Sequence, residues 1–139
     1  MRLVRMGSGS WQVLAVCDHR DRCQVVDFLR ELAASYPAAA ESMFSLLTDL
    51  IPACGPPKAE PLSKALGHGL YEFRKQPKGH KLRVIWFYGT SSTLVCTCAF
   101  SKAERTPQIR IEQSRLLRKQ YLAAQFRRQI EIVALEEIP

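Results

Sequence analysis

The pattern of apolar and polar positions at the start of the chain predicts a strand followed by a helix. Residues 11–17 (WQVLAVC) form a short apolar run bounded by polar residues, which is typical of a strand. Val25, Leu29 and Leu32 then recur at helical spacing, which predicts a helix over residues 22–35 with this face toward the core. The Gly7-Ser8-Gly9-Ser10 stretch precedes this strand, so we expect residues 1–10 to form a loose N-terminus.

A second helix is expected to begin at Pro37, because the first turn of a helix accommodates proline. Its apolar face is supplied by Ala40, Met43, Phe44, Leu47, Leu50 and Ile51. Pro52 is expected to end this helix, since proline cannot donate the next helical hydrogen bond. Residues 52–61 hold four of the eight prolines, which predicts a stiff connector.

Three later apolar segments predict strands, and a fourth segment predicts a helix. The strand candidates are Leu70–Lys75, Leu82–Tyr88 and Thr93–Phe100. A turn near Lys78 and Gly79 makes the first two a hairpin, and Leu82–Tyr88 has the apolar composition of a central strand. Thr106 and Pro107 have the residue types of a helix cap and first helical position. The segment Ile130–Ala134 is β-like.

The order of these elements predicts an α+β fold. We expect two N-terminal helices packed on a three- to four-stranded antiparallel sheet, with a basic helix near the C-terminus. A length of 139 residues is typical of a single domain spanning residues 1–139, in which residues 127–139 form a C-terminal tail. No run of eighteen apolar residues occurs, so no membrane-spanning helix is predicted.

The cysteine pattern predicts buried free thiols. The five are Cys17, Cys23, Cys54, Cys96 and Cys98, an odd number without metal-ligand spacing. Cys96 and Cys98 alternate in a predicted strand, so both should point to one core-facing side. Free thiols are typical of the reducing cytoplasm, and we expect neither a metal nor another cofactor.

The net charge of +7 is concentrated in two segments. Residues 58–83 hold seven basic and two acidic groups, and residues 102–128 hold eight basic and two acidic groups. Residues 84–101, between them, carry no charge. If this neutral segment is a core strand, the two basic blocks can converge on one surface, which indicates a polyanion-binding site.

Two arginines are the central candidates for that site. A hairpin centred on Lys78 and Gly79 places Arg74 directly opposite Arg83, on one face of the sheet. Facing like charges destabilise a sheet, so the pairing favours a shared anion, and a guanidinium suits a phosphate. The alternative is a structural ion pair between Glu72 and Arg83, with Arg74 in solvent.

Six blocks of the sequence carry a family resemblance. They are Asp27–Leu32 (DFLREL), Ser63–Leu66 (SKAL), Gly69–Arg74 (GLYEFR), Leu82–Tyr88 (LRVIWFY), Ala99–Lys102 (AFSK) and Arg105–Pro107 (RTP). From about Asp27 to Tyr121 the chain resembles the HigB-like, phage-associated branch of the RelE/ParE toxin superfamily.

The resemblance implies the toxin of a type II toxin–antitoxin system, a ribosome-dependent and metal-independent endoribonuclease that cleaves mRNA. It places Arg74, Arg83 and Lys102 at the positions that hold the scissile phosphate, while the 2′-hydroxyl of the RNA attacks. Further RNA contacts are expected from Lys64, Lys75, Lys78, Lys81, Arg105, Arg118 and Lys119. The implied partners are the ribosome, mRNA and an antitoxin of the helix-turn-helix type, in the cytoplasm.

The chain departs from the family pattern in two ways. Ala103 stands where the second lysine of a pair is usual, and the stretch to Thr106 is one residue shorter. No histidine falls in the last strand or helix, so no histidine general acid is evident. Two alternatives therefore stay open, a non-catalytic phage or prophage nucleic-acid-binding or regulatory protein, and a ParE-like toxin that poisons gyrase.

Overall fold

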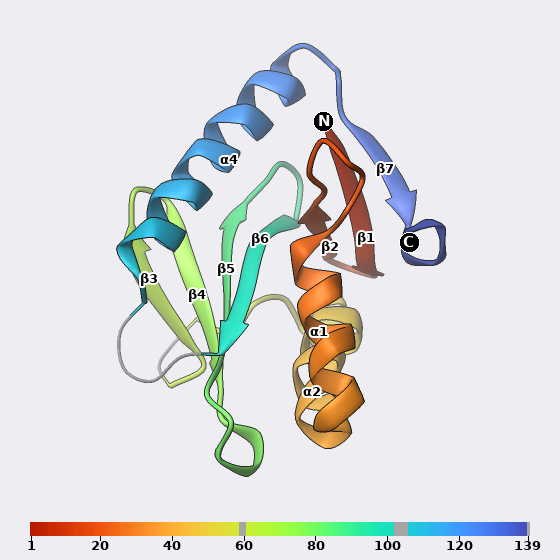
Figure 1. Ribbon diagram of the computed structural model, residues 1–139. Coiled ribbons are helices and arrows are strands. Elements are labelled where there is room, and N and C mark those ends of the chain that lie inside the picture. Colours follow the sequence, from red (N-terminus) through yellow and green to blue (C-terminus); the bar gives the residue numbers. More distant parts are fainter. Residues whose placement is uncertain (59–60, 102–105, 139) are drawn as a thin grey trace.

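The computed structural model describes residues 1–58, 61–101 and 106–138, and a seven-stranded mixed sheet forms its centre (Figure 1). The strands are β1 (Arg2–Ser8), β2 (Gln12–Val16), β3 (Ser63–Gly67), β4 (Leu70–Lys75), β5 (Leu82–Tyr88), β6 (Thr93–Ser101) and β7 (Glu131–Ala134). Their spatial order is β3-β4-β5-β6-β2-β1-β7. Neighbouring strands are antiparallel except for two parallel pairs, β2 with β6 and β1 with β7.

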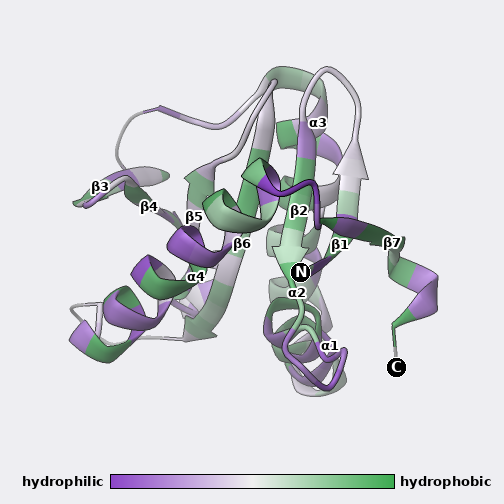
Figure 2. Ribbon diagram, turned by 90° about the horizontal axis from the view of Figure 1, so that it is seen from above, coloured by the Kyte–Doolittle hydropathy of each residue, from purple (hydrophilic) through white to green (hydrophobic). Residues whose placement is uncertain are grey.

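The helices pack on both faces of this sheet. They are α1 (Gln24–Ser35), α2 (Pro37–Ser45), the π-helical turn η1 (Leu46–Leu50), α3 (Ile51–Cys54) and α4 (Gln108–Phe126), with short 3-10 turns η2 (Pro77–Gly79) and η3 (Leu135–Glu137). One core cluster joins the sheet to the α1–α3 segment and includes the fully buried Met43, Leu47 and Trp86. A second joins it to α4, where the ring of Tyr121 lies 5.3 Å from that of Phe87. Figure 2 shows α4 alternating between hydrophilic and hydrophobic residues, whereas β2 and β6 are mainly hydrophobic.

The predicted architecture is wrong in its sheet. The structure has seven strands in a mixed sheet instead of three or four antiparallel ones, and the first helices follow β1 and β2. The added strands come largely from the two ends of the chain, and parallel pairs join segments that are far apart in sequence. Strands Leu70–Lys75 and Leu82–Tyr88 are confirmed at their predicted bounds, and β5 is a central strand.

The expectation of a loose N-terminus at residues 1–10 is also wrong. Residues Arg2–Ser8 form β1, which lies between β2 and β7, and Leu3 and Val4 are fully buried (Figure 1). A β-bulge between Arg5 and Gly7 interrupts the alternation that would have marked the strand. At Gly7 a Cβ would lie 2.7 Å from the carbonyl oxygen of Thr48, so glycine here permits close approach of the helical segment.

Replacing Leu3 with alanine should therefore lower the free energy of unfolding by about 2–5 kcal/mol, the usual cost of a cavity at a fully buried leucine. The matched control is Arg5→Ala, because Arg5 is exposed on the same strand and should change stability little. Urea unfolding followed by circular dichroism measures both. Equal midpoints for the two variants would show that β1 does not contribute to the core.

The helix ends differ from the sequence prediction at two prolines. The helical segment continues through η1 to Cys54, past Pro52, which lies in the first turn of α3, directly after the π-helical turn. Pro107 is the N-cap residue of α4, and α4 begins at Gln108. The Thr106 side chain caps no helix and instead bonds Glu72.

Cys96 and Cys98 do not share a face. Cys96 pairs with Trp86 and Cys98 with Ile85, so Thr97 is an extra residue in β6 and reverses the alternation. Cys96 therefore packs toward α1–α3 and Cys98 toward α4. Burial raises the pKa of Cys96 to about 12 and also raises the pKa of Cys98. Both thiols are free and buried, as predicted, whereas the free thiol of Cys54 is exposed.

Candidate functional site

The β4–β5 hairpin brings the two candidate arginines together. Arg74 and Arg83 are paired across the antiparallel strands, as the turn position predicted. Along β4, Leu70 packs in the core cluster under α4 and Phe73 in the cluster under α1–α3. Because side chains alternate along a strand, Glu72 and Arg74 share the face that α4 covers.

One buried carboxylate connects the two guanidiniums. Glu72 is fully buried, and its Oε1 accepts a hydrogen bond from Arg74 Nε at 2.9 Å. The same oxygen lies 3.7 Å from Arg83 Nε, within ion-pair distance. The other carboxylate oxygen accepts a hydrogen bond from the Thr106 hydroxyl. Glu72 thus holds both arginines and the residue before the N-cap of α4 in one network.

Burial decreases from Glu72 outward. The side chain of Arg83 is 11% exposed and that of Arg74 is 24% exposed, against 0% for Glu72. Burial lowers the pKa of Arg83, Glu72 raises it and Arg74 lowers it further. An arginine stays charged despite such a shift. The cluster therefore combines two positive charges with one negative charge and presents its positive ends toward the surface.

The contacts of Arg83 are less complete than those of Arg74. Its NH1 donates to the carbonyl of Leu82 at 3.0 Å. Its Nε is buried and, within the part of the chain that the structure describes, forms no hydrogen bond. A buried, charged N–H group without a hydrogen-bond acceptor attracts an anion more strongly than one that is already hydrogen-bonded.

The network differs from both sequence interpretations. The alternative of an ion pair between Glu72 and Arg83 is present, but Arg74 is not left in solvent, because it forms the closer contact with Glu72. Glu72 also supplies an anion between the facing arginines. Their pairing therefore does not by itself require an external phosphate, which was the basis of the other interpretation.

Further basic residues surround the cluster. Lys64 of β3 is paired with Glu72 and is exposed. The guanidinium of Arg110, in the first turn of α4, lies 5.5 Å from the ring centre of Phe100, which is paired with Arg83. Arg118 reaches the same side, since a Cβ at Gly69 would lie 2.9 Å from its Cζ. Sequence reasoning did not select Arg110, although its position three residues after Pro107 in a basic helix was a usable signal.

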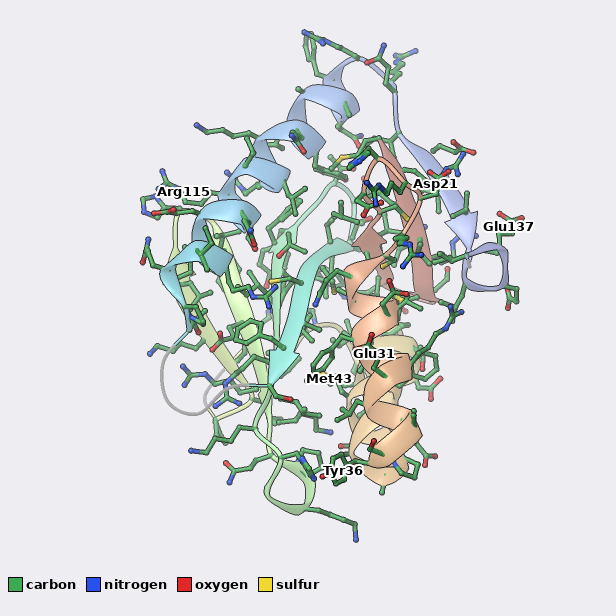
Figure 3. All side chains as sticks on the ribbon, viewed as in Figure 1. Asp21, Glu31, Tyr36, Met43, Arg115 and Glu137 are labelled. Carbon is green, nitrogen blue, oxygen red and sulfur yellow. The ribbon has the colours of Figure 1, made fainter. Side chains whose placement is uncertain are left out.

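The structure describes four of the remaining predicted RNA contacts, and they are spread over the β4–β5 hairpin and α4. Lys75 follows Arg74 and points to the opposite face, and Lys78 and Lys81 lie at the hairpin end. Lys119 is exposed on α4, near Arg115, which Figure 3 shows on the outer side of that helix. Lys102 and Arg105 fall outside the described residues.

Two negative findings apply to the described residues. No three His, Cys, Asp or Glu side chains among them come together as metal ligands. None of their helices is long and apolar enough to cross a bilayer.

Comparison with known families identifies the family of this chain. The profile of the family described as phage-derived protein Gp49-like (DUF891) matches residues 27–119, about two thirds of the chain. The chain belongs to the Gp49-like family. This family is part of the RelE/HigB toxin-like superfamily, so the predicted family is confirmed at that level. No curated protein sequence matches the chain significantly.

The matched segment contains the candidate site of this Gp49-like protein. It begins within α1, ends within α4 and includes Glu72, Arg74 and Arg83. Strands β1, β2 and β7 lie outside it. The family match therefore covers the arginine cluster and leaves out the three strands at the two ends of the chain.

Proposed function

We propose that this Gp49-like protein is the toxin of a type II toxin–antitoxin system and cleaves mRNA on the ribosome, without a metal. The observation that supports this function best is the arginine cluster. Arg74 and Arg83 are paired on adjacent strands, contact one buried carboxylate and are partly exposed. Both lie in a basic segment of the chain that the model of a toxin-like family matches.

The chemistry needs no nucleophile from the protein. In the proposed reaction the 2′-hydroxyl of the RNA attacks the neighbouring phosphate, leaving a cyclic phosphate and a 5′-hydroxyl. The protein must orient the nucleotide and stabilise negative charge on the phosphate as it develops. Arg74 uses Nε for Glu72, so its guanidinium still carries N–H groups on both terminal nitrogens for this purpose.

In this mechanism Glu72 is a positioning residue. It offsets the repulsion between the arginines before RNA arrives, so both guanidiniums are already oriented when the phosphate binds. Donors oriented in advance need no reorganisation during the reaction. Lys102, one residue after the end of β6, is proposed as a third phosphate contact. Lys64, Lys75, Lys78, Lys81, Arg105, Arg118 and Lys119 are proposed to bind RNA beyond the scissile phosphate.

The same carboxylate favours a second candidate function. Because Glu72 already balances one guanidinium, the cluster retains a single excess positive charge, which suits nucleic-acid binding without catalysis. A non-catalytic regulatory protein would bind RNA or DNA through the basic segments and leave it intact. A gyrase-poisoning toxin on this fold would need no phosphate cradle at all.

Induced expression of the chain should stop growth and produce new mRNA 5′ ends with free hydroxyl groups. The ends should appear in a purified translation system only when ribosomes are present. Co-expression of an antitoxin, which we propose to be a helix-turn-helix protein encoded beside this gene, should restore growth by covering the basic surface. Growth arrest with intact mRNA would favour the gyrase target, and RNA binding without arrest or cleavage would favour the non-catalytic protein.

A further inference from the structure

Two cysteines lie opposite each other where the chain passes from β2 to α1. Cys17 follows β2, and Cys23 is the N-cap residue of α1. They form an isolated antiparallel bridge, in which Asp18 N–H donates to the Arg22 carbonyl at 2.8 Å. This hydrogen bond, one position inside the bridge, makes Cys17 and Cys23 a pair of the closely spaced type, with Cα atoms about 4.5 Å apart. Disulfides span Cα distances from about 4.4 Å upward, so the backbone can accept one here.

The two thiols already interact and are chemically unequal. The hydrogen bond with Cys23 lowers the pKa of Cys17 and outweighs burial and the charge of Asp21, which raise it, while the charge of Arg2 lowers it further. The same hydrogen bond, together with burial, raises the pKa of Cys23. Cys17 is therefore the sulfur that becomes a thiolate, and the thiolate is the reactive form of cysteine.

Cys17 also lies where a small reagent can reach it. It lines a cleft of about 370 Å³ beside α1, together with Asp18, Gln24 and Thr97. It also lines a second cleft of about 230 Å³, together with Arg2 and Asp21. Figure 3 shows Asp21 in the loop above α1, close to β1. Cys17 is 8% exposed and Cys23 is not exposed, so a reagent meets Cys17 first.

We propose that Cys17 and Cys23 form a redox-active dithiol that hydrogen peroxide converts to an intramolecular disulfide. The Cys17 thiolate attacks one peroxide oxygen, the O–O bond breaks, and a sulfenic acid forms while hydroxide leaves and takes up a proton. The Cys23 sulfur then attacks the Cys17 sulfur, the S–O bond breaks, and hydroxide leaves as water with the Cys23 proton. Two thiols lose two electrons, and peroxide is reduced to two waters. This modification does not depend on the proposed mRNA cleavage.

The bond would fasten the end of β2 to the start of α1. The loop that it closes contains Asp21, whose backbone has a φ of 61° and whose carboxylate forms an ion pair with Arg2 at 2.8 Å. Restricting this loop in the unfolded chain stabilises the folded protein. The oxidised protein should therefore melt at a higher temperature than the reduced one, by on the order of 5 °C.

The test is peroxide treatment of the Cys54→Ser protein, which lacks the exposed thiol. Intact mass should fall by two hydrogen atoms, peptide mapping should locate a bond between Cys17 and Cys23, and a dithiol reductant should restore mass and melting temperature. Matched controls are Cys17→Ser and Cys23→Ser in the same background. Cys23→Ser should stop at the sulfenic acid of Cys17, which a dimedone probe captures, and Cys17→Ser should not react.

Three results would overturn the proposal. The first is oxidation of the Cys54→Ser protein at Cys96 or Cys98 before Cys17. The second is an unchanged mass of the Cys54→Ser protein at a peroxide concentration that oxidises Cys54 in the unsubstituted chain. The third is a disulfide that lowers the melting temperature. The mapping is made on a protein with both cysteines present, so a folding defect in either control variant leaves the result decisive.

Discussion

Replacing Arg74 or Arg83 with alanine should raise the barrier to mRNA cleavage by about 2–4 kcal/mol, as for other pre-oriented groups that stabilise developing charge. The guanidiniums face each other across β4 and β5 and share the carboxylate of Glu72, so they act as one unit. The double variant should therefore lose much less than the sum of the two single losses. A ribosome-dependent cleavage assay measures the rates.

RNA affinity distinguishes this result from simple loss of charge. Binding of the Arg74→Ala protein should weaken far less than cleavage, because many other cations remain in the two basic segments. The matched control is Arg115→Ala, which removes an exposed charge from the outer side of α4 and should leave cleavage nearly unchanged. Cleavage by Arg74→Ala at the unsubstituted rate would exclude the arginine cluster as the catalytic site.

Replacing Glu72 with alanine should lower the free energy of unfolding by about 3–5 kcal/mol, the usual cost of removing one partner from a buried ion pair. Glu72 is fully buried, and without it Arg74 and Arg83 would face each other with no anion between them, while Thr106 would lose its acceptor. Glu72→Gln should cost less, because the amide oxygen still accepts a hydrogen bond from Arg74.

The control for this prediction is Glu112→Ala, since Glu112 is exposed on α4 and should contribute little to stability. Thermal and urea unfolding of these three variants and of the unsubstituted protein measure the differences in stability. If Glu72→Ala and Glu112→Ala unfold at the same midpoint, the carboxylate does not hold the cluster together. In that case the pre-oriented cradle of the proposed mechanism is also wrong.

Sequence reasoning succeeded where structure depends on near neighbours. The turn near Lys78 and Gly79 and the alternation on each side were enough to place Arg74 opposite Arg83, because the register of a hairpin follows from its turn. The helical spacing of Val25 and Leu29 likewise identified α1 within two residues of its start. Both elements are specified by contacts within a short stretch of chain.

It failed where a residue's environment comes from distant segments. Nothing local in residues 2–8 shows that β1 will be enclosed by β2 and β7. The bulge at Thr97, which separates Cys96 from Cys98, arises only when β6 pairs with β5. The bulge in β1 also hid that strand from the sequence prediction, because it breaks the alternation from which a strand is recognised.

Composition and short-range spacing are enough to locate the basic segments, the hairpin with its paired arginines, and the family resemblance. The folded chain is needed to show that the sheet has seven strands, that Glu72 joins both arginines to Thr106, and that Cys17 faces Cys23. These relations depend on the fold because burial creates them. In the unfolded chain, water solvates the carboxylate, the guanidiniums and the thiols separately. Once the folded core excludes this water, the carboxylate pairs with the two guanidiniums and one thiol contacts the other.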